Sequence, residues 1–142
     1  MNLVVDAGVL VKLFVEEPFT TEAELLVEDR FQLHGPELLL AEFGNILWKK
    51  CRFEDLDEST AMSAIESLPD YEVRIHSNEN ILEPAFIGAT QTGQSVYDWI
   101  YLALAISLNC RFVTADRKFF LGMRNTRFTD RFVWVGNISD LV

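Results

Sequence analysis

The stretch that decides the fold is Leu3-Val4-Val5-Asp6, three β-prone apolar residues that end at an acid near the start of the chain. A short apolar run of this kind is typical of a strand buried in the middle of a sheet. We therefore expect residues 3–5 to form a first, central strand, with Asp6 at its carboxyl end.

Strands and helices alternate along the rest of the chain. Further strands are predicted at residues 31–33, 71–75, 111–115 and 132–135. Helices are predicted at residues 21–30, 37–51, 57–68, 82–92 and 97–108. The helix boundaries rest on a cap at Thr20 or Thr21, on Gly35-Pro36 before the second helix and on Gly93 after the fourth.

This alternation is typical of the α/β class. Strand–helix–strand units of this length predict right-handed crossovers and a central parallel sheet with helices on both faces. Because no repeat, linker or low-complexity tract divides the chain, we expect residues 1–142 to form a single three-layer α/β/α domain.

The composition fits one soluble domain. Of the 142 residues 49% are hydrophobic, which is enough for a core, but no apolar run is long enough to cross a bilayer. Since the chain begins without the features of a secretion signal, we expect a cytoplasmic protein. The two cysteines, Cys51 and Cys110, lack ligand spacing and are expected to be buried free thiols rather than a disulfide.

The net charge of −10 excludes the simplest kind of nucleic-acid binder, which attracts phosphates through many Lys and Arg side chains. A nucleic-acid function then needs a local remedy. Divalent cations held by carboxylates supply one, because they turn an acidic pocket into a site that accepts phosphate oxygens.

Two acids follow predicted strands directly. In an open parallel sheet, ligands bind beyond the carboxyl ends of the strands, and both Asp6 and Asp116 stand at such ends. Each is therefore a candidate site residue. The alternative for each is an ordinary turn residue.

Glu42 interrupts an apolar helical stretch. Helical spacing places it on the stripe of Leu38, Leu39 and Ile46, where a carboxylate is costly unless something pairs with it. Asn45, one turn later, is a candidate amide ligand or orienting group, or else an ordinary buried polar residue. The alternative for Glu42 is a solvated surface acid beside Lys49.

Asp98 stands at the start of a helix that is apolar nearly all round and is therefore expected to be buried. The positive end of the helix dipole favours its charged form, which suits a metal ligand. The alternative is an N-cap aspartate, and capping does not exclude metal binding.

Together the four acids predict a divalent-metal site. They stand at two strand ends, on one helix and at one helix start, positions that can converge on one edge of the sheet. Hard oxygen ligands without a histidine or cysteine cluster favour Mg²⁺ or Mn²⁺ over zinc. The reaction that fits such a site is hydrolysis of a phosphodiester.

The chain resembles PIN-domain proteins in four ordered acidic motifs. Here they read VVDAG at residues 4–8, AEFGN at 41–45, YDWIYLALA at 97–105 and TAD at 114–116. The last two motifs are especially similar to those of VapC toxins, the toxin half of VapBC toxin–antitoxin pairs. The resemblance covers nearly the whole chain, and the motifs are specific as an ordered set.

This resemblance implies a metal-dependent endoribonuclease. In it, Mg²⁺ or Mn²⁺ would be held by Asp6, Glu42, Asp98 and Asp116, and Thr114 would support them by hydrogen bonding. It also implies RNA as the substrate, a homodimer, and a small, often DNA-binding antitoxin whose C-terminal tail blocks the site. The alternatives within the family are a PIN nuclease of RNA processing or decay and a catalytically degenerate PIN module.

Two positions depart from the family pattern. Many members carry Ser, Thr or Asn where this chain has Gly8, so a polar contact to the metal shell is missing here. Some members place a further acid or Asn beyond the last motif, where this chain has Arg117 and Lys118. These two cations either contact RNA phosphates or are simply solvated, and solvation is the simpler interpretation.

Other acid-bearing α/β proteins fit the sequence less well. A receiver domain needs an acidic pair after the first strand and a phosphoacceptor Asp after the third, and a haloacid-dehalogenase-type phosphatase needs a second Asp at the position of Gly8. A dinucleotide-binding domain needs GxGxxG after the first strand. None of these patterns is present.

Overall fold

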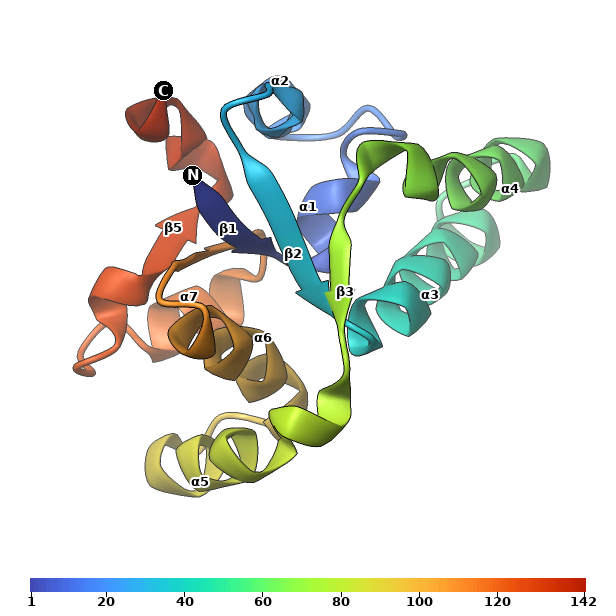
Figure 1. Ribbon diagram of the computed structural model, residues 1–142. Helices are drawn as coiled ribbons and strands as arrows, with labels where there is room; N and C mark the ends of the chain where they lie inside the picture. The colour runs from blue at the N-terminus through green and yellow to red at the C-terminus, as the bar shows by residue number, and fades with distance from the viewer.

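The computed structural model describes all 142 residues and is built around a five-stranded sheet (Figure 1). Every pair of neighbouring strands is parallel, and their order is β3-β2-β1-β4-β5. The strands are β1 (Asn2–Val5), β2 (Gln32–Pro36), β3 (Arg74–His76), β4 (Arg111–Thr114) and β5 (Phe132–Trp134). The predicted central position of the first strand is confirmed.

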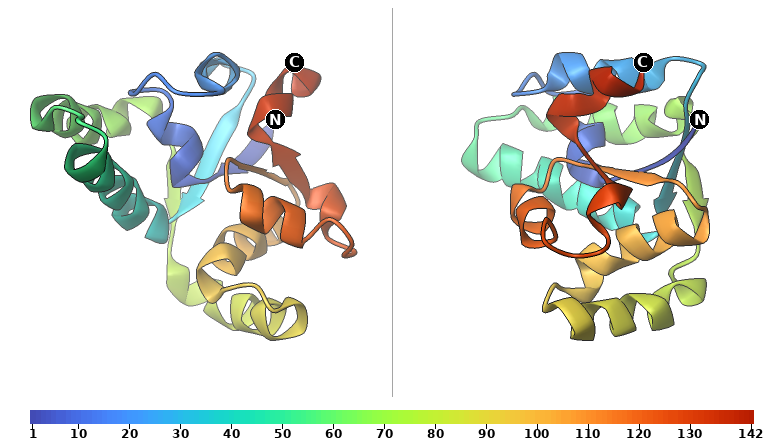
Figure 2. Two further views of the ribbon diagram at one scale, coloured as in Figure 1. Left: turned by 180° about the vertical axis from the view of Figure 1, so that it is seen from behind. Right: turned by 90° about the vertical axis from the view of Figure 1, so that its left-hand side faces the viewer.

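Helices cover both faces of the sheet. Figures 1 and 2 show α5, α6 and α7 on one side and α1, α3 and α4 on the other. The α-helices are α1 (Ala7–Val11), α2 (Thr20–Glu24), α3 (Leu38–Phe53), α4 (Glu58–Ser67), α5 (Leu82–Thr92), α6 (Val96–Ser107) and α7 (Arg117–Gly122). Short 3-10 helices are η1 (Leu25–Val27), η2 (Leu68–Tyr71), η3 (Asn78–Asn80), η4 (Thr129–Arg131) and η5 (Val135–Leu141). The three-layer α/β/α fold is thus confirmed.

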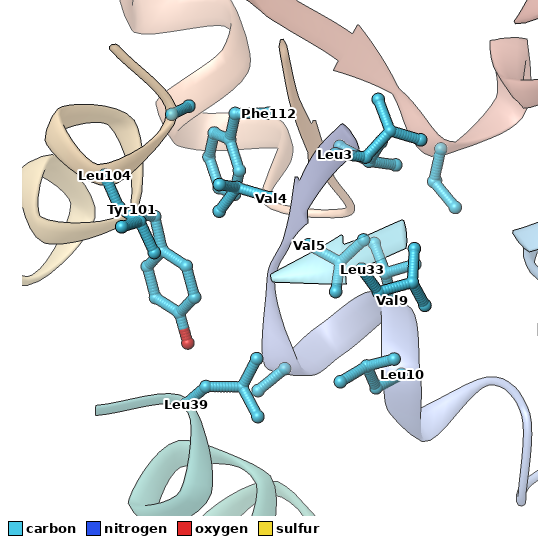
Figure 3. Close-up of a cluster of buried hydrophobic side chains, with 14 of the residues drawn as sticks. Leu3, Val4, Val5, Val9, Leu10, Leu33, Leu39, Tyr101, Leu104 and Phe112 are labelled. Carbon is cyan, nitrogen blue, oxygen red and sulfur yellow. The ribbon is translucent and has the colours of Figure 1, made fainter. Parts of the chain in front are cut away.

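The core has two halves, separated by β1. Figure 3 shows Val4 facing Tyr101 and Phe112 on one side of the strand, while Leu3 and Val5 lie on the other. The predicted all-apolar helix is α6, which is buried continuously from Trp99 to Ala105. Its burial holds the first turn of α6 in a fixed position beside the strand ends.

Several predicted boundaries were wrong. The second strand, predicted to end at residue 33, continues through Gly35 to Pro36, and Pro36 pairs with His76 of β3. A Cβ on Gly35 would lie 2.5 Å from the Leu39 Cδ1 atom, so a larger residue there would displace the Leu39 side chain. The cap of α2 is Phe19, in the left-handed conformation, because the Thr20 hydroxyl instead accepts a hydrogen bond from the Glu17 N–H.

Two short helices are absent from the sequence prediction. Both α1 and α7 begin directly after a strand-end acid, and each has too few residues to show a helical period. They matter for the site because they begin at its edge.

The two cysteines are free, Cys110 buried and Cys51 half-buried. No helix in the structure combines the length and the apolar character needed to cross a membrane.

Candidate metal centre

A small pocket of about 190 Å³ opens at the carboxyl end of the central strands. It brings together all four predicted acids, which come from the end of β1, from α3, from the first turn of α6 and from the end of β4. Its lining comprises Asp6, Ala7, Gly8, Glu42, Ile46, Asp98, Tyr101, Phe112, Thr114, Ala115, Asp116 and Phe119. Sequence positions that lie far apart therefore share one cavity, as expected for an open parallel sheet.

Asp6 is buried and held on both oxygens. Its Oδ1 accepts a hydrogen bond from the Val9 N–H at 2.8 Å, so Asp6 caps α1. Its Oδ2 accepts from the Ala115 N–H at 3.0 Å and from the Thr114 hydroxyl at 2.5 Å. Burial raises the pKa of the Asp6 carboxyl and the charge of Asp116 raises it further, although the three hydrogen bonds oppose the shift. This carboxylate is fixed in place but lacks a cationic partner.

Thr114 connects two of the acids. Besides donating to Asp6, its hydroxyl accepts a hydrogen bond from the Asp116 N–H at 2.9 Å. The Asp116 carboxylate accepts in turn from the Phe119 N–H at 3.1 Å and caps α7. Both strand-end acids thus hold the turn that follows them, and each still lines the pocket.

Glu42 lies opposite them on α3 and is half-buried. Its Oε1 is buried without any hydrogen-bond partner, and so is the hydroxyl oxygen of Tyr101. Burial raises the pKa of the Glu42 carboxyl, and the negative charges of Asp6 and the other two acids raise it further. The Tyr101 hydroxyl is near enough to oppose this shift, but it forms no aligned hydrogen bond with Glu42. Burial also raises the pKa of Tyr101, so the hydroxyl keeps its proton.

Asp98 is not the N-cap of its helix. That position belongs to Ser95, whose hydroxyl accepts a hydrogen bond from the Asp98 N–H at 3.1 Å. Asp98 lies in the first turn of α6 and is half-buried. Burial and the charge of Asp116 raise the pKa of the Asp98 carboxyl, while a hydrogen bond from the Ser95 hydroxyl and the charge of Lys118 oppose the rise.

Asn45, a predicted supporting residue, lies outside the pocket, whereas Gly8, where the chain departs from the family pattern, lies inside it. Asn45 is exposed and does not line the pocket, because Ile46 occupies that side of α3. Gly8 does line it, and a Cβ there would lie 3.4 Å from Asp6 Oδ1. A short polar side chain at this position would reach the Asp6 carboxylate, and this chain has none.

Tyr101 is the pocket residue that the sequence analysis missed. In a helix that is apolar all round, a tyrosine is taken as part of the core. The available signal was its position three residues after Asp98, which places both side chains on one helix face.

The donor chemistry of the pocket fits a hard divalent cation. Four carboxylates supply only oxygen, and Glu42 Oε1 is a buried acceptor without a partner. No three acids stand close enough to form a ready-made ligand set. Like charges repel and spread apart without a counter-ion, so side-chain rotation toward a cation would complete the set.

Comparisons with known proteins agree with the fold and the motifs. The family model described as PIN domain matches residues 3–121. Ribonuclease VapC3 of Pyrobaculum aerophilum is 36% identical over 120 residues, which cover 83% of this chain and 92% of that protein.

Two crystal structures show the same fold. PAE2754 from Pyrobaculum aerophilum superposes with a TM-score of 0.75 at 22% identity, covering 99% of this chain and 89% of the other. VapBC2 from Rickettsia felis, bound to a DNA fragment from its promoter, has a TM-score of 0.63 at 15% identity. The match covers 94% of this chain and 98% of the other.

Proposed function

Because the chain belongs to the PIN-domain family, we propose that it is a metal-dependent endoribonuclease and the toxin of a VapBC-type pair. The 36% identity to a protein named Ribonuclease VapC3 supports the reaction and the substrate class. The observation that carries the proposal is the convergence of four acids from four separate segments on one pocket.

The residues of the pocket divide into a fixed and an adjustable group. Asp6 and Asp116 are locked by hydrogen bonds to backbone N–H groups and through Thr114. Glu42 and Asp98 reach in from helices, and neither carboxylate is held by a backbone N–H group or an ion pair. The first pair would set the position of the ion, and the second pair would close around it.

Mg²⁺ or Mn²⁺ bound here would supply a nucleophilic hydroxide from water and neutralise charge on the attacked phosphate. The protein's own part is to hold the ligands in register. The apolar side chains of Ile46, Phe112 and Phe119 lower the polarity of the inner part of the pocket and so strengthen the electrostatic interactions there.

The test is cleavage of a mixed RNA pool by purified protein with Mn²⁺, with Mg²⁺ and with EDTA. We expect metal-dependent cutting that Asp98→Asn lowers by more than about a hundredfold. Substitution of a residue that only hydrogen-bonds to a metal ligand already lowers activity or metal affinity by about tenfold to a hundredfold, and a ligand itself should matter more. Asp140→Asn is the control, because Asp140 is an exposed acid far from the pocket lining.

The same experiment separates the alternatives. Equal cutting in EDTA, or by Asp98→Asn, would contradict the proposed metal site. A protein that neither cuts RNA nor binds Mn²⁺ in calorimetry would be a degenerate PIN module that works through partners.

We also propose an antitoxin and a second copy of the chain as partners, with action in the cytoplasm. An apolar pocket of about 490 Å³ between α3, α4 and β3 would take an apolar antitoxin segment. The exposed side chains of Leu82, Phe86 and Ile87 on α5 are apolar surface that a second copy would cover. Sedimentation with and without the protein encoded by an adjacent gene would test both.

A further inference from the structure

The basic residues of the chain are unevenly distributed. Residues 117–129 contain four of the twelve Lys and Arg residues and none of the 22 Asp and Glu residues. This segment therefore carries a charge of +4, while the rest of the chain carries −14. We call its four cations the basic strip: Arg117, Lys118, Arg124 and Arg127.

The basic strip begins at the candidate metal centre. Arg117 and Lys118 are the first two residues of α7, directly after Asp116. Figures 1 and 2 show α7 on the same side of the sheet as α6, which carries Asp98. The charge of Lys118 acts on the Asp98 carboxyl and opposes the rise of its pKa. This end of the strip is thus within electrostatic reach of the pocket.

The other end of the strip, at Arg127, lies near the start of α6. The end of α7 packs tightly on the loop before α6, since a Cβ on Gly122 would lie 2.5 Å from the Gln94 amide nitrogen. Further along, the Arg127 Cζ atom lies 4.8 Å from the centre of the Phe128 ring. The Phe128 ring in turn packs edge-on against Trp99, with 4.9 Å between the ring centres. Trp99 follows Asp98 in the sequence, so this end of the strip lies near the first turn of α6.

All four strip side chains are exposed, and none forms an ion pair. The ion pairs in the structure instead involve Lys12, Arg30 and Lys50. In a chain with an excess of acids, four adjacent cations without a carboxylate partner are available to an external anion. A polyanion that reaches the pocket across α7 would meet them in succession.

We infer that the basic strip binds the phosphate backbone of the RNA next to the scissile bond. The inference rests on the proposed function for the identity of the polyanion. It resolves the conflict between a net charge of −10 and a nucleic-acid substrate, because the attraction is confined to the basic strip. It also replaces the simpler interpretation that Arg117 and Lys118 are only solvated.

The test measures binding without cleavage. A fluorescein-labelled single-stranded RNA of about 16 nucleotides is titrated in EDTA by fluorescence anisotropy, at salt concentrations between about 50 and 200 mM. The wild-type protein is compared with the double variant Arg124→Gln/Arg127→Gln, whose two side chains lie outside the pocket lining. A second double variant, Arg117→Gln/Lys118→Gln, tests the end of the strip beside Asp116.

The matched control is Arg52→Gln/Arg74→Gln. Both arginines are exposed and form no ion pair, and Arg52 stacks on Phe53 much as Arg127 stacks on Phe128. They lie at the end of α3 and on the edge strand β3, away from the strip. The control therefore removes the same charge and one cation–π contact from a different surface.

We expect each strip variant to weaken RNA binding about twentyfold at about 0.1 M salt. The reason is that each phosphate contact on a single strand adds about 0.7 to the slope of the logarithm of the binding constant against the logarithm of the salt concentration, and each variant loses two contacts. The slope should fall by about 1.4 for each double variant, and the control should match the wild type. Equal loss in the control, an unchanged slope, or no RNA binding by the wild type would overturn the inference.

The outcome is separable from that of the cleavage test. If RNA is cut with metal but the strip variants bind normally, the inference fails and the proposed nuclease stands. If binding depends on the strip but no metal condition gives cutting, the inference stands and the proposed nuclease fails.

Discussion

At the scale of single residues, the Thr114 side chain links two of the four acids in the site. Its side chain is fully buried, and its one hydroxyl donates to the Asp6 carboxylate and accepts from the Asp116 backbone. A buried hydroxyl with both roles filled positions two acids with one side chain. A residue of the same shape without the hydroxyl would remove one of the three hydrogen bonds to the Asp6 carboxylate and leave the Asp116 N–H without its acceptor.

We expect Thr114→Val to destabilise the protein by about 1–3 kcal/mol, the cost of leaving buried polar groups without partners. Valine has nearly the shape of threonine, so the loss isolates the hydroxyl. Thr114→Ser keeps the hydroxyl and is the control, with a smaller loss from the missing methyl group. Urea unfolding of both variants makes the comparison, and equal stability of Thr114→Val and wild type would show that the two hydrogen bonds contribute nothing.

The four acids could be found in the sequence because each stands where local pattern makes it unusual. Asp6 and Asp116 end apolar strands, and Glu42 and Asp98 interrupt apolar helices. Tyr101 could not be found in this way, because a tyrosine is ordinary in a buried helix. Only packing shows that its hydroxyl lies unpartnered beside an unpartnered carboxylate.

At the scale of elements, the contact between α5 and α6 depends on a glycine. A Cβ on Gly88 would lie 2.3 Å from the indole ring of Trp99. The ring has no room to move, since its Nε1 donates to the Thr92 hydroxyl at 2.8 Å and Phe128 packs against its face. The first turn of α6, which holds Asp98, is therefore positioned by close helix packing.

We expect Gly88→Ala to destabilise the protein by about 1–3 kcal/mol, because overpacking forces the helices apart. Gly44 in α3 is the matched control. A Cβ there meets nothing within 4 Å, so Gly44→Ala should stabilise the protein by up to about 1 kcal/mol through helix propensity alone. Thermal unfolding of both variants tests the prediction, and a shift of the same sign in the two would contradict it.

Long elements were predicted well from the sequence and short ones poorly. The bounds predicted for α5, including Gly93 after its end, agree with the structure because capping and helical period act together there. Helices α1 and α7 have too few turns for a period. The end of β2 was misassigned because Gly-Pro is typical of a break, whereas here it lies beside an edge strand.

At the scale of the whole molecule, the excess of acids makes folding depend on pH. The raised pKa values of Asp6, Glu42 and Asp98 mean that these groups cost stability as pH rises through their folded pKa values. Burial lowers the pKa of His34, and Lys50 and Lys12 lower that of Glu17 against the effect of burial. These last two groups act in the opposite direction, because their contributions are lost as pH falls.

The pH effect of one acid is isolated by Glu42→Gln in the metal-free protein. We expect the variant to melt about 1–3 °C above the wild type at pH 7, a small shift because water screens the half-exposed carboxylate. The difference should shrink as the pH falls toward and below 4.5, the ordinary pKa of a glutamate carboxyl, and vanish about two pH units lower, where Glu42 is protonated in both the folded and the unfolded state. Differential scanning fluorimetry in EDTA measures it, and a variant less stable than the wild type at pH 7 would contradict the prediction.

Adding Mg²⁺ at pH 7 to the wild type and to Glu42→Gln tests whether Glu42 binds the ion. An ion that binds the folded state stabilises it by mass action, so the wild type should gain stability and Glu42→Gln should gain less. Equal gains in the two proteins would place the ion elsewhere.

By itself, the sequence determined the strand at residues 3–5, the long helices, the α/β class and the four acids. These follow from local signals: runs of apolar residues, caps, and polar residues where burial is expected. Only the tertiary structure decided the partners of those acids, the place of Tyr101 and the position of the basic strip. Such features depend on which distant segments pack together. The free energy of that packing comes from contacts between residues that lie far apart in the sequence, so no local pattern indicates it.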